Sequence, residues 1–186
     1  LVGSEMCIRD RLNFYHEGLY NKSLLKLLLG NYKEGWNLYE NRFFTKKHQR
    51  FEKFKQKEIF DKIIINEIPY LDKIDNFRDS DILVICEQGI GEHIIFLPLI
   101  LEAAEIARSI TLLIDPRLIP LCERSFKDIV FLPLGSKDMN HGEYKKALSI
   151  LEKKKFDYQI SVASLSRFFS KNIEDFKIDS HIKIID

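Results

Sequence analysis

The sequence has few cysteines, no long apolar run and almost no net charge. Its three cysteines, Cys7, Cys86 and Cys122, are too few and too scattered for a disulfide framework or a zinc site. No run approaches the roughly 18 apolar residues of a membrane span. With 29 Lys and Arg against 28 Asp and Glu, the net charge is +1, which gives no electrostatic case for nucleic-acid binding. These absences favour a cytoplasmic protein without a membrane span.

The chain is long and apolar enough to fold. Its 186 residues are 45% hydrophobic, which excludes a disordered chain and suits one domain with an appendage. Residues 1–11, LVGSEMCIRDR, have no hydrophobic period, no initiator Met and no signal-peptide core. That string resembles the translated read-through of a sequencing-library adapter. The resemblance implies an artefact at an assembly break, so these residues are excluded from the fold prediction.

Residues 12–44 predict two helices. Five leucines between residues 24 and 29 form an apolar helix face that stops at Gly30. A second helix is expected from Tyr32. It carries an aromatic stripe spaced by three and four residues: Trp36, Tyr39 and Phe43. Gly35 lowers helix propensity and is typical of a place where two helices approach closely.

This hairpin carries a resemblance. The string LLLGNYKEGWNLYENRF resembles the turn and second helix of a tetratricopeptide repeat (TPR), with Gly30 at the turn and Gly35 at the small packing position. A repeat array needs about three copies for stability, and the sequence contains one. The resemblance implies the last repeat of an array, with a possible protein partner; an ordinary helical hairpin is the alternative. Residues 45–80, rich in charge, predict a connector or solvated helix face rather than a nucleic-acid or membrane patch.

From residue 81 to the end, apolar runs alternate with helical patterns. The expected strands are 81–86, 110–115, 128–134 and 156–162, and the expected helices are 93–109, 116–126 and 142–153. Short apolar, β-branched strands joined by helices predict an α/β domain with a Rossmann-like parallel sheet. Such sheets bind ligands at the carboxyl ends of their strands, which directs attention to residues 87–93 and to Asp115.

The turn after the first strand combines two glycines with a helix N-terminus, where unpaired N–H groups attract anions and hydroxyls. Gly89 and Gly91 would let a ligand approach the backbone. Ile94 stands where a dinucleotide fingerprint needs its third glycine or alanine, so NAD binding is disfavoured. Asp115 sits where such folds hold ribose, but a helix cap explains it equally well.

Glu92 is the candidate general base, since a carboxylate at a helix N-terminus can take a proton from a substrate hydroxyl. The alternative is a favourable first-turn acidic residue without chemistry. His93 either assists the base or caps the helix, and no other histidine lies at metal-ligand spacing. Glu87 and Gln88 are either substrate contacts or turn stabilisers.

The string CEQGIGEHIIFLPLI resembles the opening of the N-terminal domain of bacterial TPR-linked glycosyltransferases, usually E-Q-G-x-G-D-x-x-x-F. That domain is similar to the heptosyltransferases of glycosyltransferase family 9, where a Pro follows the acidic residue by six positions, as Pro98 follows Glu92 here. The strings DPRLIPLCERSF and FDYQISVASLSRFF resemble later segments of the same group.

The resemblance implies a glycosyltransferase-B fold, in which residues 81–186 form a truncated acceptor-side domain. It implies a fragment that transfers sugar from a nucleotide-sugar donor to an acceptor hydroxyl, inactive alone without its donor-binding domain. Glu92 would be catalytic, with Glu87, Gln88, Gly89, Gly91 and His93 as substrate contacts, and with no metal or cofactor. Glu92 departs from the usual Asp, and the usual tryptophan-containing approach to the first strand is absent. The alternative is a TPR-type interaction scaffold with a non-catalytic sheet domain.

Overall fold

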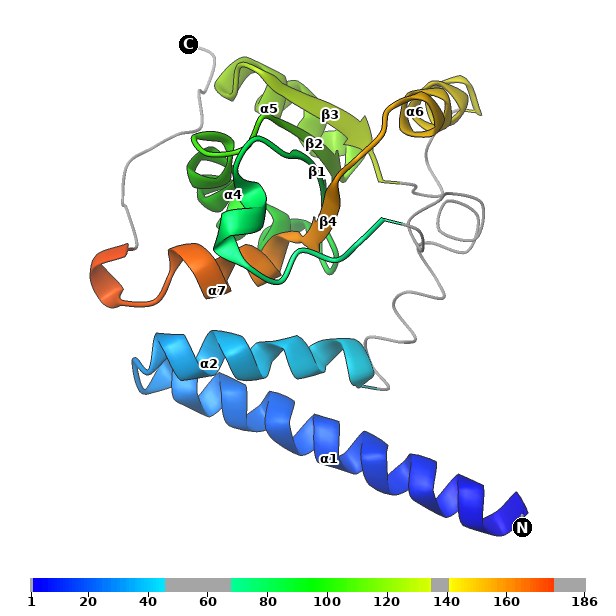
Figure 1. Cartoon of the computed structure of the whole chain (residues 1–186), viewed down its shortest axis with the longest axis vertical. Helices are drawn as coiled ribbons and strands as arrows, with labels where there is room; N and C mark the ends of the chain where they lie inside the picture. Colours follow the sequence, from blue (N-terminus) through cyan, green and yellow to red (C-terminus); the bar gives the residue numbers. More distant parts are fainter. Residues whose placement is uncertain (1, 46–67, 135–140, 176–186) are drawn as a thin grey trace.

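The computed structural model describes residues 2–45, 68–134 and 141–175. Two helices from the N-terminal part of the chain lie side by side below a unit of alternating strands and helices (Figure 1). We call the two parts the hairpin and the α/β unit. Within the described residues, no helix combines the length and apolar character needed to cross a membrane.

The hairpin consists of three helices, of which the first is the longest. They are α1 (Val2–Leu28), α2 (Tyr32–Tyr39) and the 3₁₀ helix η1 (Glu40–Phe44). Gly30 turns the chain with φ +77°, and the Asn31 side chain caps α2 by accepting a hydrogen bond from the N–H of Glu34. These observations confirm the predicted helices and turn. Helix α1 also includes residues 2–11, which the fold prediction left out; a helical backbone there does not test their origin.

Gly35 allows the two helices to touch. A Cβ atom on Gly35 would lie 2.6 Å from Cδ2 of Leu27 and 3.1 Å from the Leu27 backbone nitrogen. This confirms the close approach predicted for Gly35. The leucine face behaves differently: Leu27 packs inward, whereas Leu28 and Leu29 are 83% and 80% exposed. The prediction of one apolar face was therefore wrong, because leucines crowded into six residues point around the whole helix.

The α/β unit is built on a parallel sheet in the order β3-β2-β1-β4. Its strands are β1 (Asp81–Ile85), β2 (Ser109–Ile114), β3 (Ile129–Pro133) and β4 (Tyr158–Ser161). Its longer helices are α4 (Ile90–Ala104), α5 (Ile119–Ser125) and α6 (His141–Lys153). The described part of the α/β unit ends with η5 (Val162–Leu165), α7 (Ser166–Phe169) and η6 (Ile173–Asp175). The predicted α/β class and its parallel sheet are confirmed.

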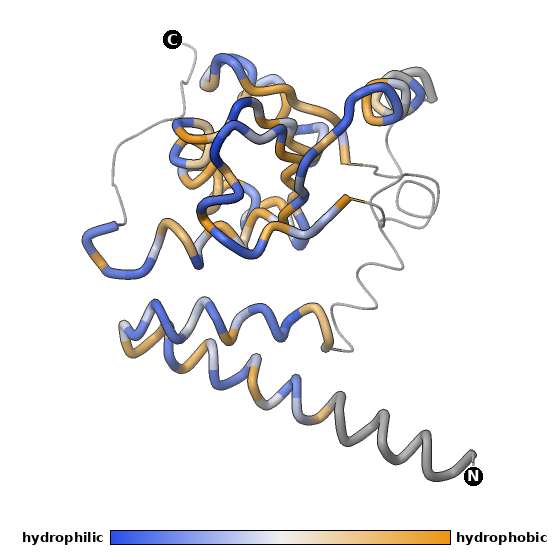
Figure 2. The backbone as a smooth tube through the Cα atoms, in the orientation of Figure 1, coloured by the Kyte–Doolittle hydropathy of each residue, from blue (hydrophilic) through white to orange (hydrophobic). Residues whose placement is uncertain are grey.

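Helices cover both faces of the sheet. On one face, alternate strand residues such as Ile82, Val84 and Leu112 share a core with helices α4 and α5. On the other face, Leu83 and Leu113 pack with helix α6. Strands β1, β2 and β3 are consequently apolar along most of their length (Figure 2), which is why their short apolar runs are recognisable in the sequence.

The described end of the predicted connector, residues 68–80, belongs to the α/β unit. Tyr70 forms a parallel bridge with Gln159 of β4, which covers the edge of the sheet. Leu71 and Phe77 are both 0% exposed and lie in the main core. This segment therefore packs as structure rather than running free as a linker. Residues 46–67, the remainder of the predicted connector after Thr45, lie outside the described residues.

Candidate functional site at the carboxyl edge of the sheet

The order of the strands reverses between β1 and β4. From β1 the chain proceeds to β2 and β3 on one side and then returns to β4 on the other side. This reversal is the topological switch point at which open α/β sheets bind ligands, beyond the carboxyl ends of the strands. The turn after Ile85 and helix η5 after Ser161 meet at this point, as Ile85 and Ser161 are partners in the ladder. The predicted site residues 87–93 therefore begin at the expected edge.

Glu87 meets an arginine from the hairpin at this edge. Oε1 of Glu87 accepts hydrogen bonds from Nη2 of Arg42 at 2.7 Å and from Nε at 3.1 Å. Each of these two residues is only 2% exposed. The sequence prediction left open whether Glu87 contacts substrate or stabilises the turn. In this conformation it holds the turn to the hairpin, since a buried, ion-paired carboxylate is not presented to a ligand.

Three further side chains complete the network around Arg42. Nη1 of Arg42 donates to Oε1 of Glu40 at 2.6 Å, and Nη2 donates to Oγ of Ser164 at 2.7 Å. Ser164 Oγ also accepts from the Tyr70 hydroxyl at 2.9 Å and donates to Glu40 Oε1 at 2.7 Å. The hairpin, the segment before β1 and the segment after β4 thus meet in one polar cluster, which we call the Arg42 network.

The charges of the Arg42 network balance one another. Burial alone would lower the pKa of Arg42, but the carboxylates of Glu87 and Glu40 outweigh burial and raise this pKa above its ordinary value. Arg167 adds a second cation, with Nε 3.6 Å from Oε2 of Glu40. The Arg42 guanidinium also lies 4.0 Å from the ring centre of Phe43, a favourable cation–π distance. Two cations therefore face two carboxylates with little exposure to water.

Gln88 also faces the hairpin. Its backbone has φ +78°, in the left-handed region that residues other than glycine rarely adopt. Its side-chain nitrogen Nε2 donates to the Tyr39 hydroxyl at 3.1 Å. Burial raises the pKa of Tyr39 to about 12. Of the two roles left open for Gln88, the turn-stabilising one is visible, since the hairpin fixes its side chain.

The two glycines of the turn have different surroundings. Gly89 caps α4 in an extended conformation, with φ −91° and ψ 166°. A Cβ there would lie 2.8 Å from Oε2 of Glu92, so the carboxylate folds back over Gly89. Gly91 lies inside the first turn of α4, where nothing would touch an added Cβ. The helix starts at Ile90, three residues earlier than predicted, so Glu92 occupies its first turn.

Glu92 and His93 point to different environments. Glu92 is half-buried at the helix N-terminus, where the helix dipole favours a negative charge. His93 is 0% exposed, and its Nδ1 lies 3.5 Å from the backbone nitrogen of Asp115. A fully buried His93 makes no ligand contact in this conformation. The turn carries two predicted carboxylates. Glu87 is ion-paired with Arg42, whereas Glu92 has no ion pair among the described residues.

Asp115 serves as a helix cap. Its carboxylate accepts from the backbone N–H of Arg117 at 3.0 Å and forms a two-point ion pair with the Arg117 guanidinium. The hydrogen bond from the Arg117 side chain is the main cause that lowers the pKa of Asp115. This geometry supports the cap interpretation rather than a ribose contact. Across the described ranges, no three His, Cys, Asp or Glu side chains are grouped as a metal site would require.

The fold and this edge define an α/β protein with a parallel sheet, whose switch point is closed by a helical hairpin. Comparisons of the chain with protein-family models, with curated proteins and with solved structures give no match.

Proposed function

We propose that this chain is the acceptor side of a glycosyltransferase, which transfers a sugar from a nucleotide-sugar donor to an acceptor hydroxyl. The observation that carries the proposal is the position of Glu92. Its carboxylate lies at the N-terminus of α4, one turn beyond the switch point, and it is half-buried without an ion pair among the described residues. The string that surrounds it, with its resemblance to TPR-linked glycosyltransferases, supports the same assignment.

In this function Glu92 would remove the proton from the acceptor hydroxyl as that oxygen attacks the sugar. Positive helix ends stabilise the ionised carboxylate, and general bases typically contribute about 10²–10⁴-fold in rate. The Arg42 network would fix the turn that carries the base, because Glu87 and Gln88 are both held by the hairpin. The donor would be bound by a second domain, which the resemblance implies. Glu87, Gln88 and His93 would then position the site rather than contact substrate.

The test uses the protein encoded by the complete gene, assayed with a panel of radiolabelled nucleotide sugars. Glu92→Gln should lower turnover by at least about 10²-fold, whereas Glu92→Asp should keep activity, because the shorter acid is the residue usual in the family. Glu105→Gln, an exposed acid at the other end of the same helix, is the matched control and should be neutral. Near-normal turnover by Glu92→Gln would exclude Glu92 as the general base. An intact protein inert toward every donor would refute the transferase.

A scaffold that binds another protein is the second candidate. The observation that favours it is a set of four exposed leucines at the end of α1 and in the turn after it, whose exposed fractions lie between 43% and 83%: Leu24, Leu25, Leu28 and Leu29. Exposed apolar patches of this kind mark interaction sites. Replacing Leu25 and Leu28 with serine should abolish partner binding without affecting turnover, so the two functions are separable by experiment.

A further inference from the structure

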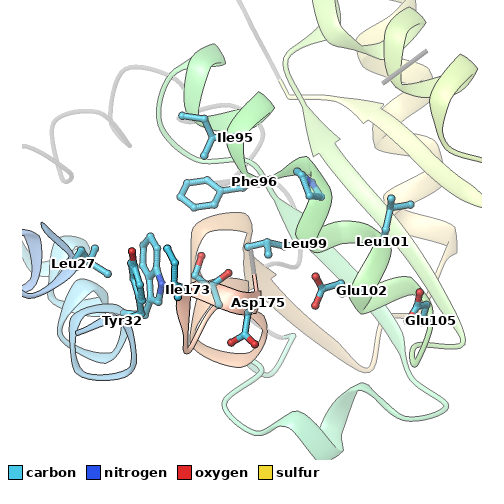
Figure 3. A pocket seen from close by; sticks show the side chains of 14 residues that line it. Leu27, Tyr32, Ile95, Phe96, Leu99, Leu101, Glu102, Glu105, Ile173 and Asp175 are labelled. Atoms are coloured by element: carbon cyan, nitrogen blue, oxygen red, sulfur yellow. The ribbon is translucent and has the colours of Figure 1, made fainter. Parts of the chain in front are cut away.

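Helix α1 packs on α2 through one row of side chains, which we call the inner seam. Its residues are spaced by four, three and four positions: His16, Tyr20, Ser23 and Leu27. The ring centre of Tyr20 lies 5.5 Å from that of Tyr39 on α2, and Ser23 is fully buried. Leu27 packs closely against Gly35, and it also lines a cavity between the hairpin and the α/β unit (Figure 3). The inner seam therefore faces the rest of the molecule.

A second row, the outer seam, runs along the opposite side of α1. Its residues are spaced by four, three, four and three positions, and all of them are exposed: Phe14, Gly18, Asn21, Leu25 and Leu28. The two seams are offset by two residues, which is about 200° of rotation around a helix. Because α2 lies between α1 and the α/β unit, the outer seam faces away from both (Figure 1). Its spacing is that of a coiled-coil heptad, in which a seam recurs every 3.5 residues on average.

The residues that flank the outer seam match a parallel pair of helices. In such a pair, the residue before one seam position meets the residue five places further along the partner helix. In α1 these positions hold Glu17 and Lys22, and then Leu24 and Leu29. The N–H of Leu29 still bonds to the carbonyl of Leu25 at 3.0 Å, so the helical course reaches this residue. An acid would thus meet a base, and a leucine a leucine, on both sides of a symmetric pair.

We propose that the outer seam binds the outer seam of a second copy of this chain, as a parallel, in-register helix pair with two-fold symmetry. The inference rests on the scaffold candidate, whose partner it names, and it does not involve Glu92. Glu17 of each copy would face Lys22 of the other. Glu17 has no ion pair among the described residues, and Lys22 lies 3.4 Å from Glu34, which pairs more closely with another lysine. Asn21 would meet its own amide, and a polar residue within a seam fixes the register.

The length of the outer seam determines how strong the pair is. The fourteen steps from Phe14 to Leu28 span about 21 Å at about 1.5 Å per residue, and a helix is about 10–12 Å wide. A strip of this size is small beside the standard interface, in which each partner buries about 800 Å². The pair should therefore be in exchange with the monomer, with a dissociation constant of about 10–100 µM.

The test is analytical ultracentrifugation of the 186-residue chain between about 5 and about 500 µM, which spans the expected dissociation constant. The unaltered chain should show a monomer–dimer equilibrium. Glu17→Lys and Lys22→Glu each replace two attractions by two repulsions, so each should weaken the dimer about tenfold at low salt and less at high salt. In an equimolar mixture of the two variants, the mixed dimer regains both attractions. Its dissociation constant should return to within about threefold of the unaltered value.

Glu123→Lys and Lys127→Glu are the matched controls, because they make the same charge changes at exposed positions of the α/β unit. They should leave association unchanged, whether alone or mixed. Recovery on mixing also shows that the outer-seam variants are folded. A monomer at every concentration, a dimer that the single variants do not weaken, or a mixture that fails to recover would each overturn the inference. A monomer that binds a different protein through Leu25 and Leu28 would overturn this inference and keep the scaffold candidate.

Discussion

Removing Arg42 should destabilise the protein far more than removing an exposed arginine. Its guanidinium donates to Glu87, Glu40 and Ser164, and it is 2% exposed. Arg42→Met keeps most of the side-chain volume but leaves Glu87 charged, buried and without its cation. Breaking one partner of a buried pair typically costs about 3–5 kcal/mol, so the free energy of unfolding should fall by that amount.

The origin of this cost can be isolated with a second substitution. Glu87→Gln alone leaves Arg42 paired with Glu40 and should cost about 1–3 kcal/mol, since one charged hydrogen-bond partner is lost. In the combination with Arg42→Met the uncompensated buried charge is gone. The double variant should therefore be no less stable than Arg42→Met alone, which makes the coupling between the two sites at least as large as the cost of Glu87→Gln, about 1–3 kcal/mol.

The measurement is urea unfolding followed by far-ultraviolet circular dichroism and by Trp36 fluorescence. Trp36 reports on the hairpin and circular dichroism on the whole chain, so non-coincident transitions would reveal undocking of the hairpin alone. Arg117→Met is the matched control, because Arg117 pairs with Asp115 while its side chain is 71% exposed; its cost should stay below about 1 kcal/mol. Equal costs for the two arginines, or strictly additive effects at Arg42 and Glu87, would refute the reasoning.

Two further predictions concern the hairpin. Gly35→Ala should cost about 1–3 kcal/mol in urea unfolding, because the new Cβ meets Leu27, whereas Gly18→Ala in open space on α1 should gain up to about 1 kcal/mol from helix propensity. A stabilising Gly35→Ala would show that the helices can separate without cost. Because the pKa of Tyr39 is raised to about 12, stability should be full below pH 10 and fall by up to about 2–3 kcal/mol as the pH rises to 12. Tyr39→Phe should remove its share of this fall, while the share of Tyr70, whose pKa burial also raises to about 12, remains; an unchanged slope would exclude Tyr39 as a source.

The features that the sequence predicts well are local ones. Strands β1, β2 and β3 are short, mainly apolar runs, and burial on both faces makes each run nearly continuous, so the core of the parallel sheet follows from composition and spacing. Gly30 and Gly35 were assigned correctly for the same reason, since a turn and a close helix contact each leave a mark at one residue. The parallel sheet then indicates that the turn at residues 87–93 lies at the ligand-binding edge, even though the residues that contact this turn are unknown from the sequence.

The partners at the site could not be predicted, because they are distant in sequence. Arg42 lies 45 residues from Glu87 and 122 residues from Ser164, and no periodic pattern joins positions so far apart. The one available signal was the place of Arg42 beside Tyr39 and Phe43, on the edge of the aromatic stripe. Charged residues are usually exposed there, so the pattern favours a solvated arginine. Only the docking of the hairpin turns it into a buried one.

That docking decides how the two candidate functions relate. In an independent recognition module, the hairpin would leave the geometry of the α/β unit untouched, and the unit could work without it. Here Glu87 and Gln88, the first residues of the predicted site, are held by Arg42 and Tyr39 of the hairpin. Glu92 follows directly on this turn, so its carboxylate is placed by a backbone that the hairpin fixes. A transferase built on this chain would therefore need its hairpin for catalysis as well as for any partner, and Arg42→Met should lower turnover even under conditions in which the protein stays folded.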